Sequence, residues 1–347
     1  MGSKKPVVAG QAAARPCPFD VEVLKDQYGR NQTFGSGAWS TVYKATTYSR
    51  TEIHAGLPSP PASPKLSLPV LVAVKRPLNK DAITIIESEA KILSFISTVD
   101  GCEDYVVPFY GIDTRDSSLV LAAVPLSFDH YITRCAQNSA QNLSTRNMTE
   151  PVIGSTGVWL DLAYQMISAL DWLHNEAGVV HGDIKPGNIL LSQNSTPLSP
   201  FPYRPLFADF SSSQLLDAPE PTPNTLSAVT REYTAPELLS SAVLRNPKSM
   251  ATTASDVFSL AVTLLVAATG DTMVYSGSMF QRQAMATQGW HVLSHVRNGE
   301  QGSRVPRQGV VERTLERAVL KAGMGRISAE RWKDVVEQMV RGEPTKL

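Results

Sequence analysis

The chain has 347 residues, and 42% of them are hydrophobic, which is enough to bury a substantial core. Lys plus Arg and Asp plus Glu both number 32, so no overall charge marks a protein that binds nucleic acid or a membrane surface. The three cysteines lie far apart without a C-x-x-C pair, which favours a reducing compartment over a disulfide framework or a zinc site. The longest strongly apolar stretch, 260–268, is much shorter than the roughly 20 residues of a membrane span. We therefore expect an intracellular protein, cytoplasmic or nuclear, with no membrane span and no nucleic-acid partner.

The first residues of the chain and four internal segments lack the periodicity of helices and strands. Residues 1–22 are rich in Ala, Pro, Gly and Lys and predict a disordered tail. Segments rich in Pro, Ser, Thr and Asn predict loops or insertions at 48–69, 137–157, 194–205 and 211–229. We interpret 48–69 as an expanded loop between strands, with docking of a partner protein as the alternative.

The periodic segments change character along the chain. Short β-type runs lie in the front third, at 41–45, 70–75 and 119–124. Farther on, apolar spacing from Leu160 predicts a helix that Gly178 ends. A second, buried helix is predicted over about 255–269, capped by Ser255 or Asp256. This order predicts an α+β fold with a strand-rich first lobe and a helical second lobe, and a cleft between lobes commonly binds a ligand.

Two glycines in a predicted hairpin, Gly35 and Gly37, flank Ser36 and would let backbone N–H groups approach a phosphate closely. On its own this is also compatible with an ordinary Gly-Ser hairpin. About 30 residues later, Lys75 ends an apolar strand. In the predicted helix 81–97, apolar residues place Glu89 on the inward face, where a carboxylate needs a partner. We therefore expect Glu89 to pair with Lys75.

The strongest signal is the segment H-G-D-I-K-P-G-N at residues 181–188. It places Asp183, Lys185 and Asn188 within six residues, and a second carboxylate, Asp209, follows a later apolar run. Phosphoryl transfer requires groups that orient a hydroxyl, neutralise charge and hold a metal ion. The oxygen atoms of Asp183, Asn188 and Asp209 suit magnesium.

From Gly35 to Asp209 these motifs resemble the eukaryotic protein kinase family, of the serine/threonine type, with H-G-D in place of H-R-D. The resemblance implies a two-lobed kinase fold, with a β-rich N-lobe containing one main helix and a mostly helical C-lobe. The expected kinase domain is 23–347, with the N-lobe at about 28–121, the hinge at about 122–125 and the C-lobe at about 126–345.

The resemblance also implies the cofactors ATP and Mg²⁺ and protein substrates. The residues it implies for binding them are Gly35, Ser36, Gly37, Val42, Ala73, Lys75, Glu89, Leu121, Ala123, Asn188 and Asp209. Among these, Leu121 resembles a gatekeeper, and Asn188 and Asp209 would ligate Mg²⁺. The catalytic residues would be Asp183, which accepts or orients the substrate hydroxyl, together with Lys185 and Lys75.

Three residues farther back resemble structural positions of the family: Glu237 in A-P-E, Asp256 as a buried helix-capping aspartate, and Arg326, expected to pair with Glu237. Lys185 and the segment 230–233 are similar to serine/threonine-type rather than tyrosine-type kinases. The expected reaction is therefore transfer of the γ-phosphate of ATP to serine or threonine hydroxyls.

Three residues depart from the family pattern: Ser40 and Ser211 replace glycines, and Gly182 replaces an arginine. They leave open a pseudokinase scaffold, and H-G-D-x-x-x-x-N also resembles small-molecule kinases that act on aminoglycosides or choline. Because Gly182 has no side chain to gather a phosphate, we expect activity to be largely independent of phosphorylation within 211–229. The alternative is that Arg231 supplies the missing cation.

Overall fold

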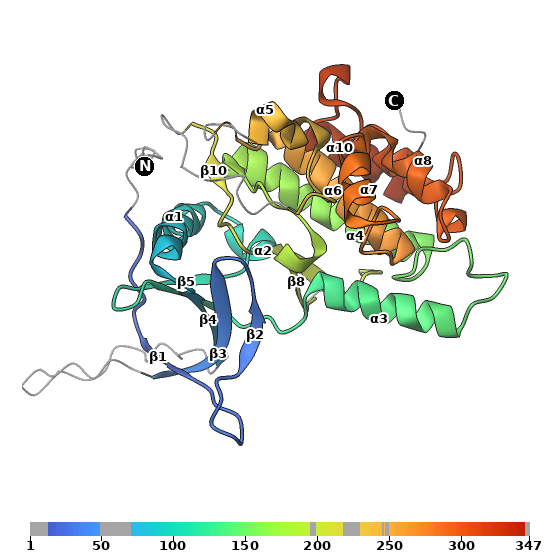
Figure 1. The fold of residues 1–347 in the computed structure, drawn as a ribbon. Helices are drawn as coiled ribbons and strands as arrows, with labels where there is room; N and C mark the ends of the chain where they lie inside the picture. Colours follow the sequence, from blue (N-terminus) through green and yellow to red (C-terminus); the bar gives the residue numbers. More distant parts are fainter. Residues whose placement is uncertain are drawn as a thin grey trace, which may run out of the picture. The chain divides into compact units, whose positions relative to one another are not determined.

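A computed structural model describes residues 13–48, 71–194, 199–217, 230–244, 246 and 250–343. The chain divides into two compact units, the first formed by 1–98 and 107–125 and the second by 99–106 and 126–347. The first unit is rich in strands and has one main helix, and the second is mostly helical, which confirms the predicted α+β organisation (Figure 1). Among the described residues, no helix combines the length and the apolar character needed to cross a bilayer.

The first unit contains a six-stranded antiparallel sheet in the order β1-β3-β4-β6-β5, with β2 paired to β3. Its strands are β1 (Asp20–Val23), β2 (Thr33–Ser36), β3 (Ser40–Tyr48), β4 (Leu71–Pro77), β5 (Phe109–Asp113) and β6 (Ser118–Ala122). Helix α1 (Lys80–Ile96) begins after Asn79, whose side chain accepts a hydrogen bond from the Ala82 N–H. The predicted strands and the predicted helix 81–97 are therefore present, although β6 ends two residues before Val124.

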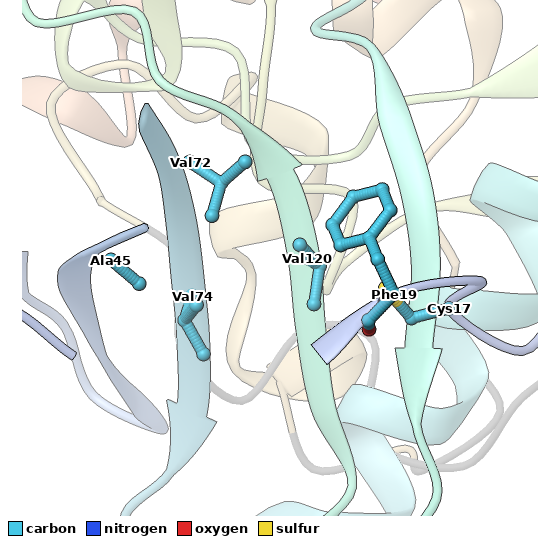
Figure 2. Packing of buried hydrophobic residues seen from close by; sticks show 6 residues of the cluster. All are labelled: Cys17, Phe19, Ala45, Val72, Val74 and Val120. Atoms are coloured by element: carbon cyan, nitrogen blue, oxygen red, sulfur yellow. Dashed lines mark hydrogen bonds between the residues drawn. The ribbon is translucent and has the colours of Figure 1, made fainter. Parts of the chain in front are cut away.

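Apolar residues on one face of the sheet are covered by the N-terminal segment of the described chain. The buried cluster consists of Cys17, Phe19, Ala45, Val72, Val74 and Val120 (Figure 2). The predicted disordered tail is therefore wrong for residues 13–22, because Cys17 and Phe19 find a burial site on the sheet that local composition does not reveal. Residues 1–12 lie outside the described residues.

The described part of the second unit contains helices and four short strands, which pair β7 with β10 and β8 with β9. Its α-helices are α2 (Cys102–Tyr105), α3 (Phe128–Gln141), α4 (Thr156–Asp171), α5 (Ser241–Leu244), α6 (Thr253–Thr269), α7 (Met279–Ala286), α8 (Val292–Arg297), α9 (Val310–Leu315) and α10 (Ala329–Arg341). Its strands are β7 (Val179–Val180), β8 (Ile189–Gln193), β9 (Tyr203–Phe207) and β10 (Gln214–Leu215). Short 3₁₀ turns occupy Pro186–Asn188, Pro236–Leu239, Gly289–His291, Gly302–Arg304 and Ala322–Met324, and a π-helical turn, Trp172–Glu176, continues α4.

Helix α6 is buried from Ser255 to its last residue, because apolar residues predominate around its whole circumference. The Trp159 indole of α4 donates to the Leu264 carbonyl at 3.0 Å, which ties the two helices together. The predicted cap at Ser255 or Asp256 is wrong. Thr252 caps the helix, its side chain accepting from the Ser255 N–H in a capping box, and Asp256 lies inside the first turn.

The predicted loops are shorter than expected where the structure describes them. Helix α3 continues to Gln141, β9 begins at Tyr203, and β10 lies at Gln214–Leu215. Local composition missed β10 because its partner strand, β7, lies far away in the sequence. Residues 49–69, 195–198 and 218–229 of the predicted loops lie outside the described residues.

Candidate active site

Lys75 and Glu89 form the buried ion pair that the helical spacing predicts. Lys75 Nζ lies 2.9 Å from Glu89 Oε1 and 2.7 Å from Oε2, so it donates to both carboxylate oxygens. The two side chains are 6% and 1% exposed. Such burial is tolerable only because each charge has a partner. The pair joins β4 to α1, so its geometry depends on where that helix lies against the sheet.

The other predicted nucleotide-binding residues of the first unit lie on neighbouring strands. Val42 on β3 is opposite Lys75 on β4, and Ala73 is opposite Leu121 on β6, so these four residues share one face of the sheet. Ala123 follows the end of β6 by one residue.

The β2–β3 hairpin carries the glycines. Gly35 pairs with Val42, and the Gly37 N–H donates to the Ser40 carbonyl at 2.8 Å. Among the residues that the structure describes, a Cβ added at Gly35 would meet nothing within 4 Å, and one at Gly37 would only touch the Ser40 carbonyl oxygen at 4.0 Å. Neither residue has a positive φ. Among the described residues, the space beside the backbone at these two positions is therefore open, as the predicted approach of a phosphate group would require.

In the second unit, Asp183, Lys185 and Asn188 form one hydrogen-bonded group. Lys185 Nζ lies 2.6 Å from Asp183 Oδ2, and the Asn188 amide donates to the Asp183 carbonyl at 2.9 Å and to its Oδ2 at 3.1 Å. Lys185 Nζ also lies 2.9 Å from Thr230 Oγ1. The segment 230–233 was predicted to matter for substrate type, but the Thr230 hydroxyl was not predicted as a partner of Lys185.

Asp209 is brought to this group by the β8–β9 hairpin. Ile189 pairs with Phe207, and the Ala208 N–H donates to the Asn188 carbonyl at 2.9 Å, so Asp209 follows directly after the residue tied to Asn188. Asp209 has a φ of 62°, a left-handed conformation that costs energy for a residue with a Cβ. Ser211 is not in that conformation, as we expect for a residue that replaces glycine.

Burial raises the pKa of the Asp183 carboxyl above its usual range. The Lys185 cation acts in the opposite direction and lowers the pKa of Asp183, while the negative charge of Asp209 raises it further. A raised pKa brings this carboxyl closer to the range in which a general base accepts a proton near neutral pH.

The residues before Asp183 are held through their backbone by Asp256. Its carboxylate accepts from the His181 N–H at 2.7 Å and from the Gly182 N–H at 2.9 Å, and His174 Nε2 lies 3.1 Å from it. Asp256 thus does not cap its own helix but fixes the loop before Asp183, a role that spacing along the sequence did not reveal.

His181 packs against two aromatic rings, Phe207 and Phe210, and makes three hydrogen-bond contacts. Its Nε2 lies 3.1 Å from the Ala208 carbonyl, and its Nδ1 accepts from the Asp183 N–H at 3.3 Å, so the proton resides on Nε2. Its own carbonyl accepts from the Ser213 hydroxyl at 2.8 Å. The histidine therefore connects the loop that carries Asp183 to the segments on both sides of Asp209.

Gly182 has a structural reason to be glycine. Its φ is 84°, and a Cβ built on it would overlap the carbonyl oxygen of Ser212. The segment after Asp209 therefore packs directly against the backbone of Gly182. A side chain at this position would require that segment to move.

Glu237 and Arg326 form the predicted ion pair of the helical unit. Arg326 donates to both Glu237 oxygens, at 2.7 and 3.2 Å, and to the carbonyls of Leu320 and Ala254. The Arg326 side chain is 1% exposed and lies 5.1 Å from the centroid of the Phe258 ring. Because its partner is 29% exposed, this is a buried arginine with a partly exposed carboxylate.

Residues 71–346 match the family model of the protein kinase domain. The chain belongs to the protein kinase domain family. The serine/threonine-protein kinase ISR1 of Saccharomyces cerevisiae is 26% identical over 68% of this chain and 49% of its own length. The ISR1 kinase of Eremothecium gossypii is 29% identical over 48% of this chain and 45% of its own length, and the lectin-domain containing receptor kinase VI.3 of Arabidopsis thaliana is 32% identical over 40% and 18%. The chain therefore spans less than half the length of each of these relatives.

Two contacts of the candidate active site could not be predicted from the sequence. Thr230 and Asp256 lie 45 and 75 positions from their partners Lys185 and His181, too far for spacing rules to connect them. The available signal was chemical, because a carboxylate on the buried, predominantly apolar helix α6 requires hydrogen-bond donors, and the N–H groups of His181 and Gly182 supply them.

Proposed function

We propose that this protein kinase domain is catalytically active and transfers the γ-phosphate of ATP to serine or threonine hydroxyls of protein substrates, using Mg²⁺. The observation that carries the proposal is the connected group around Asp183, which accepts from Lys185 and Asn188 while the Asn188 carbonyl is tied to the residue before Asp209. A chain that served only as a scaffold would have no need to keep these costly buried polar contacts.

In the proposed reaction, bound ATP with Mg²⁺ supplies the phosphoryl group and part of the charge neutralisation. Lys75 holds the α/β-phosphates and is itself fixed by Glu89. Asp183 orients the substrate hydroxyl and accepts its proton, and Lys185 offsets the negative charge that develops on the transferred group.

The oxygen atoms near Asp183 fit Mg²⁺. Asn188 and Asp209 would ligate it with an amide and a carboxylate oxygen, which are ligands that this ion accepts. Within the described ranges, no three His, Cys, Asp or Glu side chains form a ready metal site. Magnesium would therefore take its remaining ligands from the nucleotide phosphates and from water, as it commonly does.

Two residues support serine/threonine specificity. Lys185 and the segment that begins at Thr230 are similar to those of serine/threonine-type kinases, and Lys185 Nζ lies 2.9 Å from Thr230 Oγ1. Both ISR1 relatives carry the name serine/threonine-protein kinase. Because the reaction consumes ATP, we place the enzyme inside the cell, in the cytoplasm or nucleus. Docking of a partner by 48–69 stays a prediction, since 49–69 lies outside the described residues.

The test is to compare wild type with Lys75→Met and Asp183→Asn by phosphate incorporation into a peptide array and into basic protein, beside a melting curve. We expect transfer to serine and threonine to fall by a factor of about 10³ or more in both variants, because each loses a group used in the reaction. ATP with Mg²⁺ at 100 times its dissociation constant should stabilise wild type by about 2.7 kcal/mol.

The controls are Lys91→Met and Asp100→Asn, whose residues are exposed. They make the same chemical changes away from the site and should leave transfer unchanged. Full activity of Lys75→Met or Asp183→Asn would contradict the roles assigned. Absence of both transfer and thermal shift in wild type would instead favour a scaffold, and transfer only to small amines added in parallel would favour a small-molecule kinase.

A further inference from the structure

Residues 13–19, here called the strap, lie beside one edge of the first unit's sheet and lead into β1. Pro16 forms an isolated parallel bridge with Ile112 of β5, which is an edge strand. The Ile112 N–H donates to the Arg15 carbonyl at 2.8 Å, and the Cys17 N–H donates to the Ile112 carbonyl at 2.9 Å. The strap therefore satisfies backbone groups that an edge strand otherwise leaves open.

On one face of the sheet, the strap is anchored by apolar side chains. Cys17 and Phe19 are buried against Val74 and its neighbours in the cluster of Figure 2. The Phe19 ring also meets the Tyr110 ring edge-on, with centroids 5.6 Å apart. Val74 adjoins Lys75 on β4, so this cluster lies on the face opposite the Lys75 side chain.

On the other face, the strap contacts helix α1. The Arg15 N–H donates to Ser94 Oγ at 2.8 Å, and the Ser94 hydroxyl donates in turn to the Ala90 carbonyl at 2.6 Å. The Arg15 guanidinium donates to the Phe109 carbonyl at the start of β5. It also lies 5.7 Å from the centroid of the Phe109 ring. Ser94 is five residues after Glu89, about 7.5 Å along the same helix.

Gly111 of β5 lies where the backbone of the strap approaches this strand closely. Its φ is 143°, and a Cβ built on it would lie 2.5 Å from the Cys17 nitrogen and 2.6 Å from the Pro16 carbonyl carbon. These are backbone atoms, so a side chain here cannot be accommodated by rotating a neighbour. Only glycine lets the strap approach β5 this closely.

We propose that the strap is a positioning element that holds α1 where Glu89 pairs with Lys75, so that its release lowers kinase activity. This inference rests on the proposed function, in which Lys75 binds nucleotide phosphates. The strap is fixed to one face of the sheet by Cys17 and Phe19 and to α1 by the bond to Ser94. Glu89 lies within that helix, and a displacement of about 1 Å would break hydrogen bonds of 2.7 and 2.9 Å.

Two substitutions in the full chain test the proposal from different sides. Gly111→Ala pushes the strap from β5 without altering α1 or any strap side chain. Ser94→Ala removes the acceptor of the strap bond. Its matched control is Ser97→Ala, because Ser97 likewise donates to a helix carbonyl four residues back, at 2.7 Å, and no described contact joins it to the strap.

Hydrogen exchange of the α1 amides is one readout, with α10 of the second unit as internal reference. The other is the steady-state rate with ATP and peptide. We expect Ser94→Ala to lower kcat/KM for ATP about fivefold, equivalent to one hydrogen bond of about 1 kcal/mol, and Gly111→Ala to lower it about tenfold or more. The α1 amides should exchange faster in both variants, whereas α10 and the KM for peptide stay unchanged.

Unchanged α1 exchange in folded Gly111→Ala protein would overturn the proposal, and so would equal effects of Ser94→Ala and Ser97→Ala. Faster exchange in α1 and α10 alike would also overturn it, because that result shows only a general loss of stability. If wild type transfers no phosphate, the proposed function fails, but α1 exchange still decides whether the strap holds the helix.

Discussion

The two groups of candidate active-site residues are built in different ways. In the first unit, the Lys75–Glu89 pair joins side chains from a strand and a helix, so its geometry depends on the position of the whole helix. In the second unit, the loop before Asp183 is fixed through its backbone, by Asp256 and by the close approach of Ser212 to Gly182. The first group is therefore sensitive to every contact that holds α1, whereas the second depends on a few atoms of its own surroundings.

The largest effect on stability is expected in the second unit, at Arg326. Arg326→Ala removes a buried cation that serves Glu237 and two backbone carbonyls, so we expect a loss of about 3–5 kcal/mol in the free energy of unfolding. Urea unfolding measures this loss in the free energy of unfolding. Arg331→Ala, an exposed position on α10, is the control and should change stability by at most about 0.5 kcal/mol. Equal stability of the two variants would refute the structural importance of the pair.

Gly182→Ala tests the backbone packing of the loop before Asp183. The added Cβ meets the Ser212 carbonyl in a left-handed conformation, and we expect a cost of about 1–3 kcal/mol together with reduced phosphate transfer. Gly187→Ala is the matched control in the same loop, because its Cβ would meet nothing within 4 Å. If the two variants have the same melting temperature and the same rate of phosphate transfer, the loop is not held by this contact.

Lys185→Met should change the pH dependence of the remaining activity. The Lys185 cation lowers the pKa of Asp183, so removing it raises that pKa further. Activity of a general base is lost as pH falls through its pKa, and the acid limb of the kcat/KM profile should therefore move to higher pH. Lys91→Met should leave the limb in place. A limb that stays fixed, or moves to lower pH, in Lys185→Met would mean that Asp183 does not set it.

The smallest effect is expected from removing phosphate. The beginning of the segment after Asp209 is already packed: Ser212 lies against Gly182, and Ser213 is buried and bonded to the His181 carbonyl. We therefore expect phosphatase treatment to change turnover by less than tenfold, which corresponds to a change of about 1.4 kcal/mol in the activation free energy.

A second arm replaces Ser211, Ser212, Ser213, Thr222, Thr225 and Ser227 by alanine. Because Ser213 has a structural bond, the decisive set is the three residues at 222, 225 and 227. Arg231, the alternative cation, contacts Gln283 at 3.4 Å. If alanine at these three positions lowers turnover tenfold and Arg231→Ala lowers it equally, phosphate controls the segment through this arginine.

Sequence alone predicted the parts of the site that depend on local periodicity or on compact motifs. Glu89 could be assigned because one helix with a 3.6-residue repeat determines which face is buried. The grouping of Asp183 with Asn188 followed from their closeness in the chain. The role of Asp256 and the burial of Cys17 could not be predicted, because each depends on a partner far away in sequence, His181 or Val74.

The π-helical turn Trp172–Glu176 lies between α4 and the segment that leads to His181. It accommodates one more residue than an α-helical turn would, and it carries His174, which reaches Asp256. Deleting one residue here would convert the wide turn into an ordinary helical turn and would shift His174 from the position at which it reaches Asp256. Insertions or deletions between Asp171 and His181 should therefore be tolerated less readily than in an ordinary surface loop.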